Sequence, residues 1–157
     1  MKSINKMKIN TFALILLLMA ASCNPYRHVT KLSSMSELKY DFPVHYADLS
    51  NGIKLAYTDE GKGDETILMI HGLGSYSPAW KKNIADLSKD YRVIAIDLPG
   101  YGKSSKDPHS GLMSFYAGVV AEFIQKLNLG KVNLAGHSMG GQISMVLTLE
   151  KPELVKR

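Results

Sequence analysis

Apolar residues along positions 42–157 fall into short runs that alternate with longer stretches of mixed polarity. Residues 66–70, 91–96 and 132–135 are mostly apolar, which is typical of strands buried on both faces of a parallel sheet. The longer stretches between them carry apolar residues at helical spacing. This alternation predicts an α/β fold, in which parallel strand–helix–strand units place helices on both faces of one sheet.

Three helices are expected between and after these strands. Pro78 suits a helix start, and the apolar residues that follow it recur at helical spacing. Residues 113–127 form an amphipathic pattern that ends before Gly130, which is a favoured residue just beyond a helix. Residues 139–150 form the last predicted helix, and Pro152 follows it.

An antiparallel hairpin is expected ahead of the parallel units. Residues 44–48 and 53–58 read as strands on either side of Asn51 and Gly52. Both of these residues tolerate positive φ, so the sequence predicts a two-residue type I′ turn. Residues 97–110 are rich in charged residues, proline and glycine, and they are predicted to be a loop.

The N-terminus reads as an export signal. Residues 1–10 are basic and polar, and residues 11–21 are an apolar run whose length suits a signal peptide (about 7–15 residues) rather than a membrane-spanning helix. Cys23 follows small residues in A-A-S-C, which resembles a bacterial lipoprotein signal. The expected division is a signal peptide at 1–22, a lipidated Cys23 with its tether at 23–41, and a domain at 42–157.

This division predicts an exported protein of the bacterial cell envelope, held to a membrane through lipid on Cys23. Ordinary secretion to the periplasm or medium is the alternative. The distribution of charge agrees with an export signal, because three of the lysines behind the formal net charge of +5 lie in the predicted signal peptide. The remainder of the chain has 16 basic and 14 acidic residues, so its charge indicates no nucleic-acid partner. A single cysteine also excludes an intrachain disulfide framework and a cysteine-based zinc site.

The third buried strand leads directly into G-H-S-M-G-G at residues 136–141. Ser138 is the centre of G-x-S-x-G, the pattern of a sharp strand-to-helix turn that presents a serine hydroxyl to a cleft. Gly136 and Gly140 flank the serine because Cβ atoms would clash in such a turn. The N–H groups at the start of the next helix favour negative charge on a reacting oxygen. This pattern predicts a nucleophilic serine.

Two further motifs accompany the serine: H-G-L-G at residues 71–74, with Gly72 in the loop after a strand, and D-L-P-G-Y-G-K-S at 97–104. Together with residues 136–141, they resemble the α/β-hydrolase family in order and spacing. The resemblance covers residues 42–157 and looks closest to the serine-nucleophile branch of lipases, carboxylesterases, carbon–carbon hydrolases and iminopeptidases. It implies the α/β-hydrolase fold, with its N-terminal hairpin before the parallel units.

The resemblance also implies roles for individual residues. Ser138 would be the nucleophile, and the backbone N–H groups of Leu73 and Met139 would form the oxyanion hole. From the residues themselves, His71 is expected to order the oxyanion loop rather than act as a base, and Asp97 is expected to anchor its own loop by accepting backbone N–H bonds. A serine at the elbow argues against the epoxide-hydrolase and dehalogenase relatives, which carry aspartate there.

Other site chemistries are less well supported by the sequence. Residues 102–104 read G-K-S, which matches the end of a phosphate-binding loop. However, Asp97 stands where the first glycine of that motif belongs, and Pro99 interrupts the loop. The histidines show no metal-ligand spacing on any one element, so the sequence predicts neither a metal nor a cofactor.

The sequence lacks a general base in the expected place. In the family, the acid and then the histidine follow the nucleophile, yet residues 139–157 contain neither histidine nor aspartate. Glu150 and Glu153 lie at the far end of the last helix, several turns from the elbow. We therefore expect a chain truncated after the nucleophile helix, with residues 151–157 leading toward a next strand and the outer edge of 132–135 open.

The predicted function is a serine hydrolase of ester-like bonds that acts on a small-molecule acyl substrate through an acyl-enzyme. The triad acid and histidine are missing from this sequence, so the chain alone should be nearly inactive. One alternative is a hydrolase-fold protein that binds without catalysis. Another is a hydrolase of a thioester, an N-terminal amide or a carbon–carbon bond.

Overall fold

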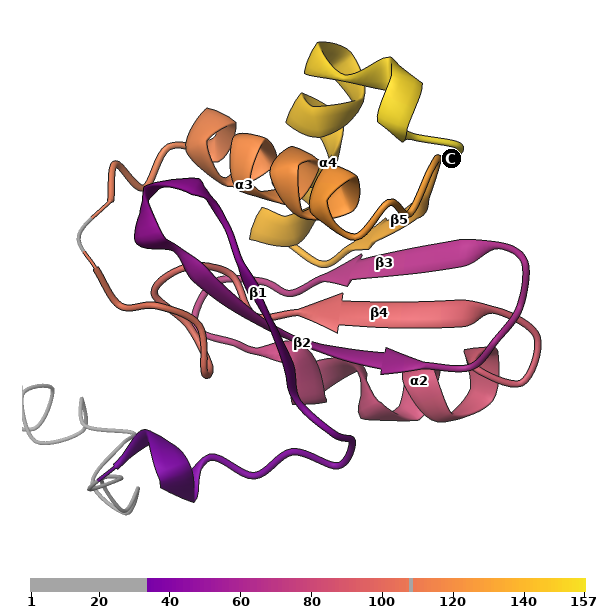
Figure 1. Ribbon diagram of the computed structural model, residues 1–157, viewed down its shortest axis with the longest axis horizontal. Coiled ribbons are helices and arrows are strands. Elements are labelled where there is room, and N and C mark those ends of the chain that lie inside the picture. The colour runs from indigo at the N-terminus through magenta and orange to yellow at the C-terminus, as the bar shows by residue number, and fades with distance from the viewer. Residues whose placement is uncertain (1–33, 108) are drawn as a thin grey trace, which may run out of the picture. The chain divides into compact units, whose positions relative to one another are not determined.

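The computed structural model describes residues 34–107 and 109–157, which form a five-stranded sheet with helices on both faces (Figure 1). The strands are β1 (His45–Asp48), β2 (Lys54–Glu60), β3 (Thr66–Ile70), β4 (Arg92–Ile96) and β5 (Asn133–Gly136). The helices are α2 (Lys81–Leu87), α3 (Met113–Lys126) and α4 (Met139–Glu150). Short 3-10 turns lie at η1 (Met35–Glu37), η2 (Ser50–Gly52), η3 (Ser77–Trp80) and η4 (Pro152–Leu154).

The strand order is β1-β2-β4-β3-β5. β3 pairs in parallel with both β4 and β5, whereas β2 pairs in antiparallel fashion with β1 and β4. The predicted α/β fold is confirmed, with an antiparallel hairpin followed by parallel strand–helix–strand units. The carboxyl ends of β3, β4 and β5 meet at one edge of the sheet, where ligands bind in open α/β sheets.

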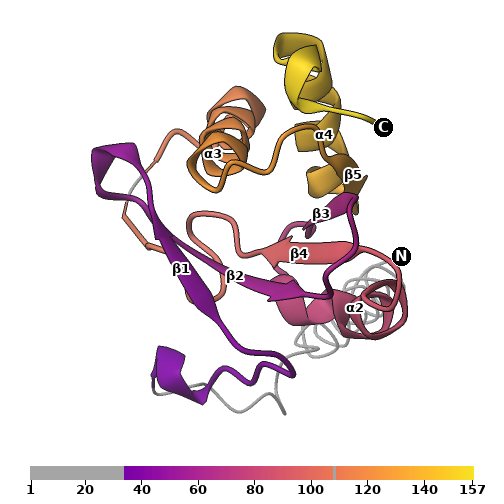
Figure 2. The ribbon, with the colours of Figure 1, turned by 45° about the vertical axis from the view of Figure 1, so that its right-hand side comes forward.

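Each face of the sheet has its own core. Ile94 and Ile96 of β4 pack into the cluster that includes α3 and α4, and both are fully buried. Val93 and Ala95 point the other way and pack with Ile84 of α2. Figure 2 shows α2 on the opposite side of the sheet from α3 and α4. This two-sided burial explains why the strand sequences are continuous apolar runs.

The hairpin connection differs from the predicted type I′ turn. β1 and β2 pair as far as Asp48 and Lys54, so residues 49–53 form a five-residue connection that contains η2. Gly52 has a φ of 76°, and the N–H of Leu49 donates to the carbonyl oxygen of Ile53 over 2.7 Å. The two-residue turn is therefore wrong, although the hairpin itself is confirmed.

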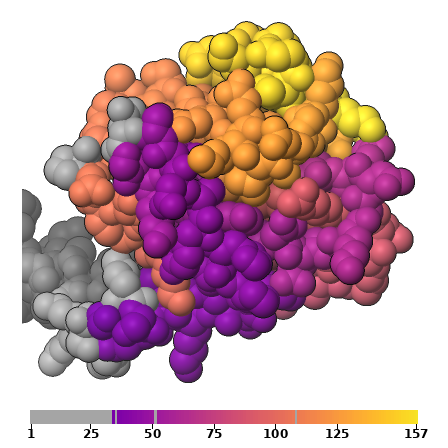
Figure 3. Space-filling view, viewed as in Figure 1, coloured from indigo at the N-terminus to yellow at the C-terminus, as the bar shows by residue number. Residues whose placement is uncertain are grey.

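The longer connection has a physical reason in what its residues contact. Leu49 is 7% exposed and packs in the core under the hairpin. Ser50 donates its N–H and its hydroxyl to the two carboxylate oxygens of Glu122 on α3, over 2.5 and 2.8 Å. The surfaces of the hairpin and of α3 accordingly adjoin in the space-filling view (Figure 3). A tight turn would not bring these residues onto α3.

Helix boundaries agree closely with the sequence at α3 and α4, but less well near Pro78. There the chain first makes the 3-10 turn η3, and α2 follows with seven residues. α4 spans the predicted residues, and α3 ends one residue early at Lys126. No helix in the described part of the chain is long and apolar enough to cross a membrane.

The outer edge of β5 is partly paired by the residues after α4. Val132 forms a parallel bridge with Val155. Along the same edge, Lys156 N–H donates to the carbonyl oxygen of Val132, and Leu134 N–H donates to that of Arg157, each over 2.8 Å. The expected open edge is therefore wrong. That residues 151–157 lead toward a next strand stays a prediction, which this parallel pairing supports.

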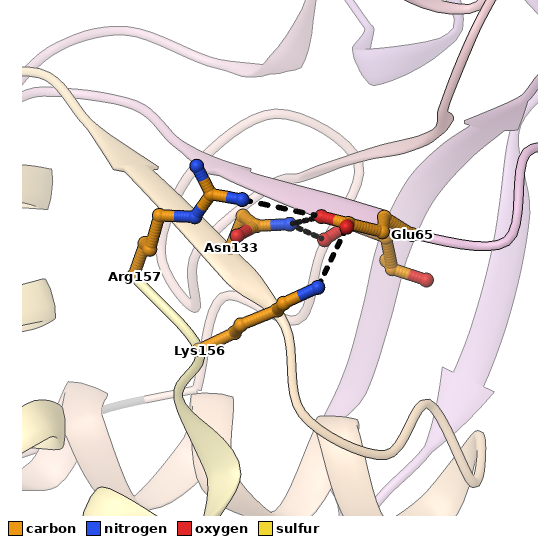
Figure 4. Close-up of polar contacts among 5 residues, drawn as sticks. Glu65, Asn133, Lys156 and Arg157 are labelled. Carbon is orange, nitrogen blue, oxygen red and sulfur yellow. Dashed lines mark hydrogen bonds and ion pairs between the residues drawn. The ribbon is translucent and has the colours of Figure 1, made fainter.

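A charged cluster holds these C-terminal residues against the start of β3 (Figure 4). One carboxylate oxygen of Glu65 accepts from Lys156 Nζ over 2.6 Å, and the other lies 3.7 Å from Arg157 and accepts from Asn133 over 3.1 Å. The bonds from Lys156 and Asn133 lower the pKa of Glu65. The cluster lies at the ends of the strands opposite to Ser138.

Candidate active site

The turn between β5 and α4 has the geometry of a nucleophile elbow. Ser138 has φ 52° and ψ −117°, a conformation that L residues rarely adopt and that costs backbone strain. Its side chain is exposed, and its carbonyl oxygen accepts from Gly141 N–H over 2.9 Å as α4 begins. The strained backbone therefore presents the serine hydroxyl at the carboxyl end of the sheet.

The glycines of the elbow sit where a side chain has no room. A Cβ on Gly136 would lie 2.4 Å from the carbonyl oxygen of Gly140. A Cβ on Gly140 would lie 2.1 Å from the carbonyl oxygen of Ile70, at the end of β3. Gly72 is less crowded, but a Cβ there would approach the Cβ of Ser138 to 3.2 Å. These close backbone approaches bring the loop after β3 against the elbow.

A pocket of about 290 Å³ opens beside the serine. The N–H groups of Leu73 and Met139 make no hydrogen bond within residues 34–107 and 109–157, so both can donate to a bound oxygen. Leu73 is 75% exposed in the loop after β3, and Met139 is the first residue of α4. The pocket is lined by His71, Gly72, Leu73, Ser75, Ala79, Trp80, Asn83, His137 and Ser138.

His71 ties together the loops after β3 and β4. It is 1% exposed; its Nδ1 donates to the carbonyl oxygen of Gly72 over 2.7 Å, and its Nε2 accepts from Leu98 N–H over 3.1 Å. This pairing fixes a neutral ring with the proton on Nδ1. Burial lowers the pKa of His71, while the bond to Gly72 and the charge of Asp97 oppose that shift. With both nitrogens engaged, the ring is not free to act as a base toward Ser138.

Asp97 is the other buried polar residue beneath the loops. It is fully buried, and its Oδ1 accepts from Ser77 N–H over 2.7 Å. Its Oδ2 accepts from Lys103 N–H over 2.9 Å and from the hydroxyl of Tyr40. The carboxylate thus joins the N-terminal segment to the loops after β3 and β4.

A match to a family of known proteins agrees with this geometry. The family described as alpha/beta hydrolase fold matches residues 65–157. The chain belongs to the α/β-hydrolase family. Its motifs therefore lie in the structural context that the family gives them, at the carboxyl edge of the parallel strands.

Three of the proteins that this chain resembles are hydrolases with different named activities. An (E)-2-((N-methylformamido)methylene)succinate hydrolase of Acinetobacter baylyi is 41% identical over 109 residues, which are 69% of this chain and 41% of that protein. A 2-hydroxy-6-oxononadienedioate/2-hydroxy-6-oxononatrienedioate hydrolase of Escherichia coli is 39% identical over 108 residues, which are 66% of this chain and 38% of that protein. A solved epoxide hydrolase of Vigna radiata shares the fold with TM-score 0.68 and 30% identity, over 78% of this chain and 39% of that one. The chain thus spans about two fifths of the length of these relatives.

Among the described residues of this α/β-hydrolase chain, His45, His109 and His137 do not pair with the serine. Within the described residues, no hydrogen bond reaches the hydroxyl of Ser138. His109 stacks on Phe115 with ring centroids 4.9 Å apart, and the ring of His45 lies against Tyr57 on the hairpin. His137 is exposed and lines the pocket. The described residues thus hold a serine and free N–H donors, but no paired base.

The phosphate-loop alternative does not fit the hydrolase structure. Ser104 is 4% exposed; its hydroxyl donates to the carbonyl oxygen of Asp97 and accepts from Ala56 N–H over 2.8 Å. Because both of its hydrogen-bonding roles are used internally, Ser104 is not available to a nucleotide. Residues 102–104 instead belong to the packing of the loop after β4.

Three residues contribute polar groups to the site that the sequence does not mark. Asn83 lines the pocket from the first turn of α2, and the buried indole N–H of Trp80 has no partner among the described residues. Tyr40 lies in the segment that was expected to be tether, and it contacts Asp97. No local motif marks Tyr40, because its contact joins residues 57 positions apart.

Proposed function

We propose that the protein is a serine hydrolase of ester-like bonds. Ser138 Oγ attacks the substrate carbonyl carbon, the oxygen becomes an oxyanion held by the N–H groups of Leu73 and Met139, and the alcohol leaves with a proton. Water then hydrolyses the acyl-enzyme and restores the serine. The observation that carries the proposal is the strained, exposed Ser138 in a pocket beside two free N–H donors. One such donor is typically worth about 2.7–4 kcal/mol of the barrier.

This mechanism needs a base that takes the serine proton. His71 is excluded by its two internal hydrogen bonds. We propose that an acid and a histidine follow this sequence, in the family order of nucleophile, acid and histidine. The relatives offer room for them, since the chain spans about two fifths of their length.

A hydrolase of another bond is the second candidate. The names of the relatives support it, because they describe hydrolases of two unsaturated diacid derivatives and of epoxides. The serine at position 138 favours attack on a carbonyl carbon over the epoxide reaction, for which the related enzymes use aspartate. A panel of esters, thioesters, N-terminal amides and carbon–carbon substrates separates these activities by comparing kcat/KM.

The nucleophile is tested by a fluorophosphonate, which reacts with activated serines. The full-length protein is expected to be labelled on Ser138, and Ser138→Ala is expected to lose labelling and turnover. Ser36→Ala is the control, because Ser36 is exposed in η1 and lies outside the pocket. A folded full-length wild type that resists labelling would instead favour a non-catalytic binding protein.

We also propose that the mature protein is anchored in the bacterial envelope by lipid on Cys23, with a small-molecule acyl compound as substrate. The support is the sequence of residues 1–23 alone, since these residues lie outside the described part of the chain.

A further inference from the structure

The residues that precede the sheet form a strap, defined here as residues 39–42, across the loops of the candidate site. The hydroxyl of Tyr40 donates to Oδ2 of Asp97. Its ring meets that of Tyr76 edge to face, with centroids 5.4 Å apart, and Lys103 Nζ lies 4.5 Å from its centre. Tyr40 thus contacts the loop after β3, the loop after β4 and the carboxylate beneath both.

The rest of the strap is attached on both sides of Tyr40. The hydroxyl of Tyr76 donates to the carbonyl oxygen of Lys39 over 3.4 Å. Asp41 lies 3.6 Å from Lys81 at the start of α2. Phe42 packs against the core cluster that includes Ile84. Several independent contacts therefore hold the strap in one place.

Asp97 transmits the contact from the strap to the loop after β3. Its Oδ1 accepts from Ser77 N–H, and Ser77 is the last residue of the segment 71–77 that carries Leu73. A buried carboxylate depends strongly on each of its donors. Burial and the bond to Asp97 raise the pKa of Tyr40, so its hydroxyl stays protonated and remains a donor.

We infer that Tyr40 is a positioning residue of the hydrolase site, which acts through Asp97 to hold residues 71–77 so that the Leu73 N–H faces the pocket of Ser138. This inference rests on the proposed function for its catalytic consequence. The contact itself is independent of that function.

The test compares Tyr40→Phe with Tyr46→Phe in the full-length protein. Both changes remove one hydroxyl, but Tyr46 lies on β1 and is 46% exposed. Tyr40→Phe is expected to speed hydrogen exchange of the Ser75 and Ser77 amides, which are hydrogen-bonded within residues 71–77 and to Asp97 respectively, by about tenfold or more, since a hydrogen bond to a charged group is lost. Exchange in β4 and β5 is expected to stay unchanged, which shows that the variant is folded.

Turnover of an ester is measured in parallel, per site titrated with fluorophosphonate. Tyr40→Phe is expected to lower kcat by about tenfold with KM nearly unchanged, because the oxyanion donor acts on the transition state. Tyr46→Phe is expected to behave as wild type.

Unchanged exchange in residues 71–77, or an unchanged kcat per titrated site, overturns the inference while an active wild type keeps the proposed function. A wild type that neither labels nor turns over overturns the proposed function and, with it, the catalytic part of the inference. In that case, faster exchange in Tyr40→Phe still supports the structural part.

Discussion

Gly140 shows most directly how single residues shape the elbow. A Cβ at this position would lie 2.1 Å from the carbonyl oxygen of Ile70, which is backbone and cannot rotate away. Gly140→Ala is therefore expected to destabilise the protein by about 1–3 kcal/mol, measured by urea unfolding.

Gly118 provides the matched control for this change. It is exposed in α3, and a Cβ there meets nothing within 4 Å. Gly118→Ala is expected to stabilise the protein by about 0.5–1 kcal/mol, because alanine is the better helix residue. Equal effects of the two substitutions would contradict the close approach at Gly140.

His71 gives the site a defined response to pH. Its pKa is lowered in the folded protein from the ordinary 6.5, mainly by burial, so the unfolded chain binds a proton more readily. The free energy of unfolding is therefore expected to fall as the pH drops from about 6.5 through the lower pKa of the folded protein. Urea unfolding on both sides of this window measures the loss.

His71→Gln is expected to flatten this part of the pH dependence, since glutamine does not titrate. His45→Gln is the control, because His45 is exposed on β1. If His71→Gln retained the full wild-type pH dependence, another group would have to be responsible.

At the scale of elements, the charged cluster around Glu65 stabilises the pairing of the C-terminal residues with β5. Glu65→Gln removes the charge that faces Lys156 and Arg157. The amide of Lys156 is expected to exchange about two- to fivefold faster, a small effect because the cluster is near the surface. Hydrogen exchange with residue resolution measures it.

Asp86→Asn is the control for the cluster. It removes a comparable charge from the exposed ion pair between Asp86 on α2 and Lys89 just beyond that helix. Faster exchange of Lys156 in this variant as well would show that loss of a negative charge in general, rather than of Glu65, is responsible.

The elements were predictable where local pattern and tertiary packing agree. The run 66–70 is strand β3 because all of its positions except the half-buried Ile67 are buried, with α2 covering one face of the sheet and α3 and α4 the other. The hairpin turn was not predictable, because Leu49 and Ser50 are held by the core and by Glu122, which lies 72 residues from Ser50. The sequence predicts only that residues 151–157 lead toward a strand. It does not predict that Val155 pairs with Val132, because that register depends on the position of β5.

The candidate site likewise has a part that the sequence predicts and a part that it does not. The elbow and its glycines form a contiguous motif, so residues 136–141 identify their own conformation. The anchoring by Asp97 was expected in outline, but its third donor, Tyr40, was not. Contacts between distant segments carry no sequence signature in a single chain.

At the scale of the whole molecule, the proposed anchor makes a prediction of its own. Cells that produce the full-length protein are expected to attach an alkyne-tagged fatty acid to it and to retain it in the membrane fraction. Cys23→Ser is expected to lose the tag and to leave the membrane fraction. Ser138→Ala should keep both, since it lies in the folded domain. A Cys23→Ser protein that still carried the fatty acid would contradict lipidation at this residue.

The strap also has a consequence for how this protein tolerates changes in length. Residues inserted or deleted before position 34 leave the contacts of Tyr40, Asp41 and Phe42 intact. A single residue inserted between positions 40 and 42 instead prevents the Tyr40 hydroxyl and the Phe42 ring from making their contacts at the same time. Natural relatives that keep this strap should therefore vary freely in the length of the chain before it, yet show a fixed spacing from the tyrosine to the first strand.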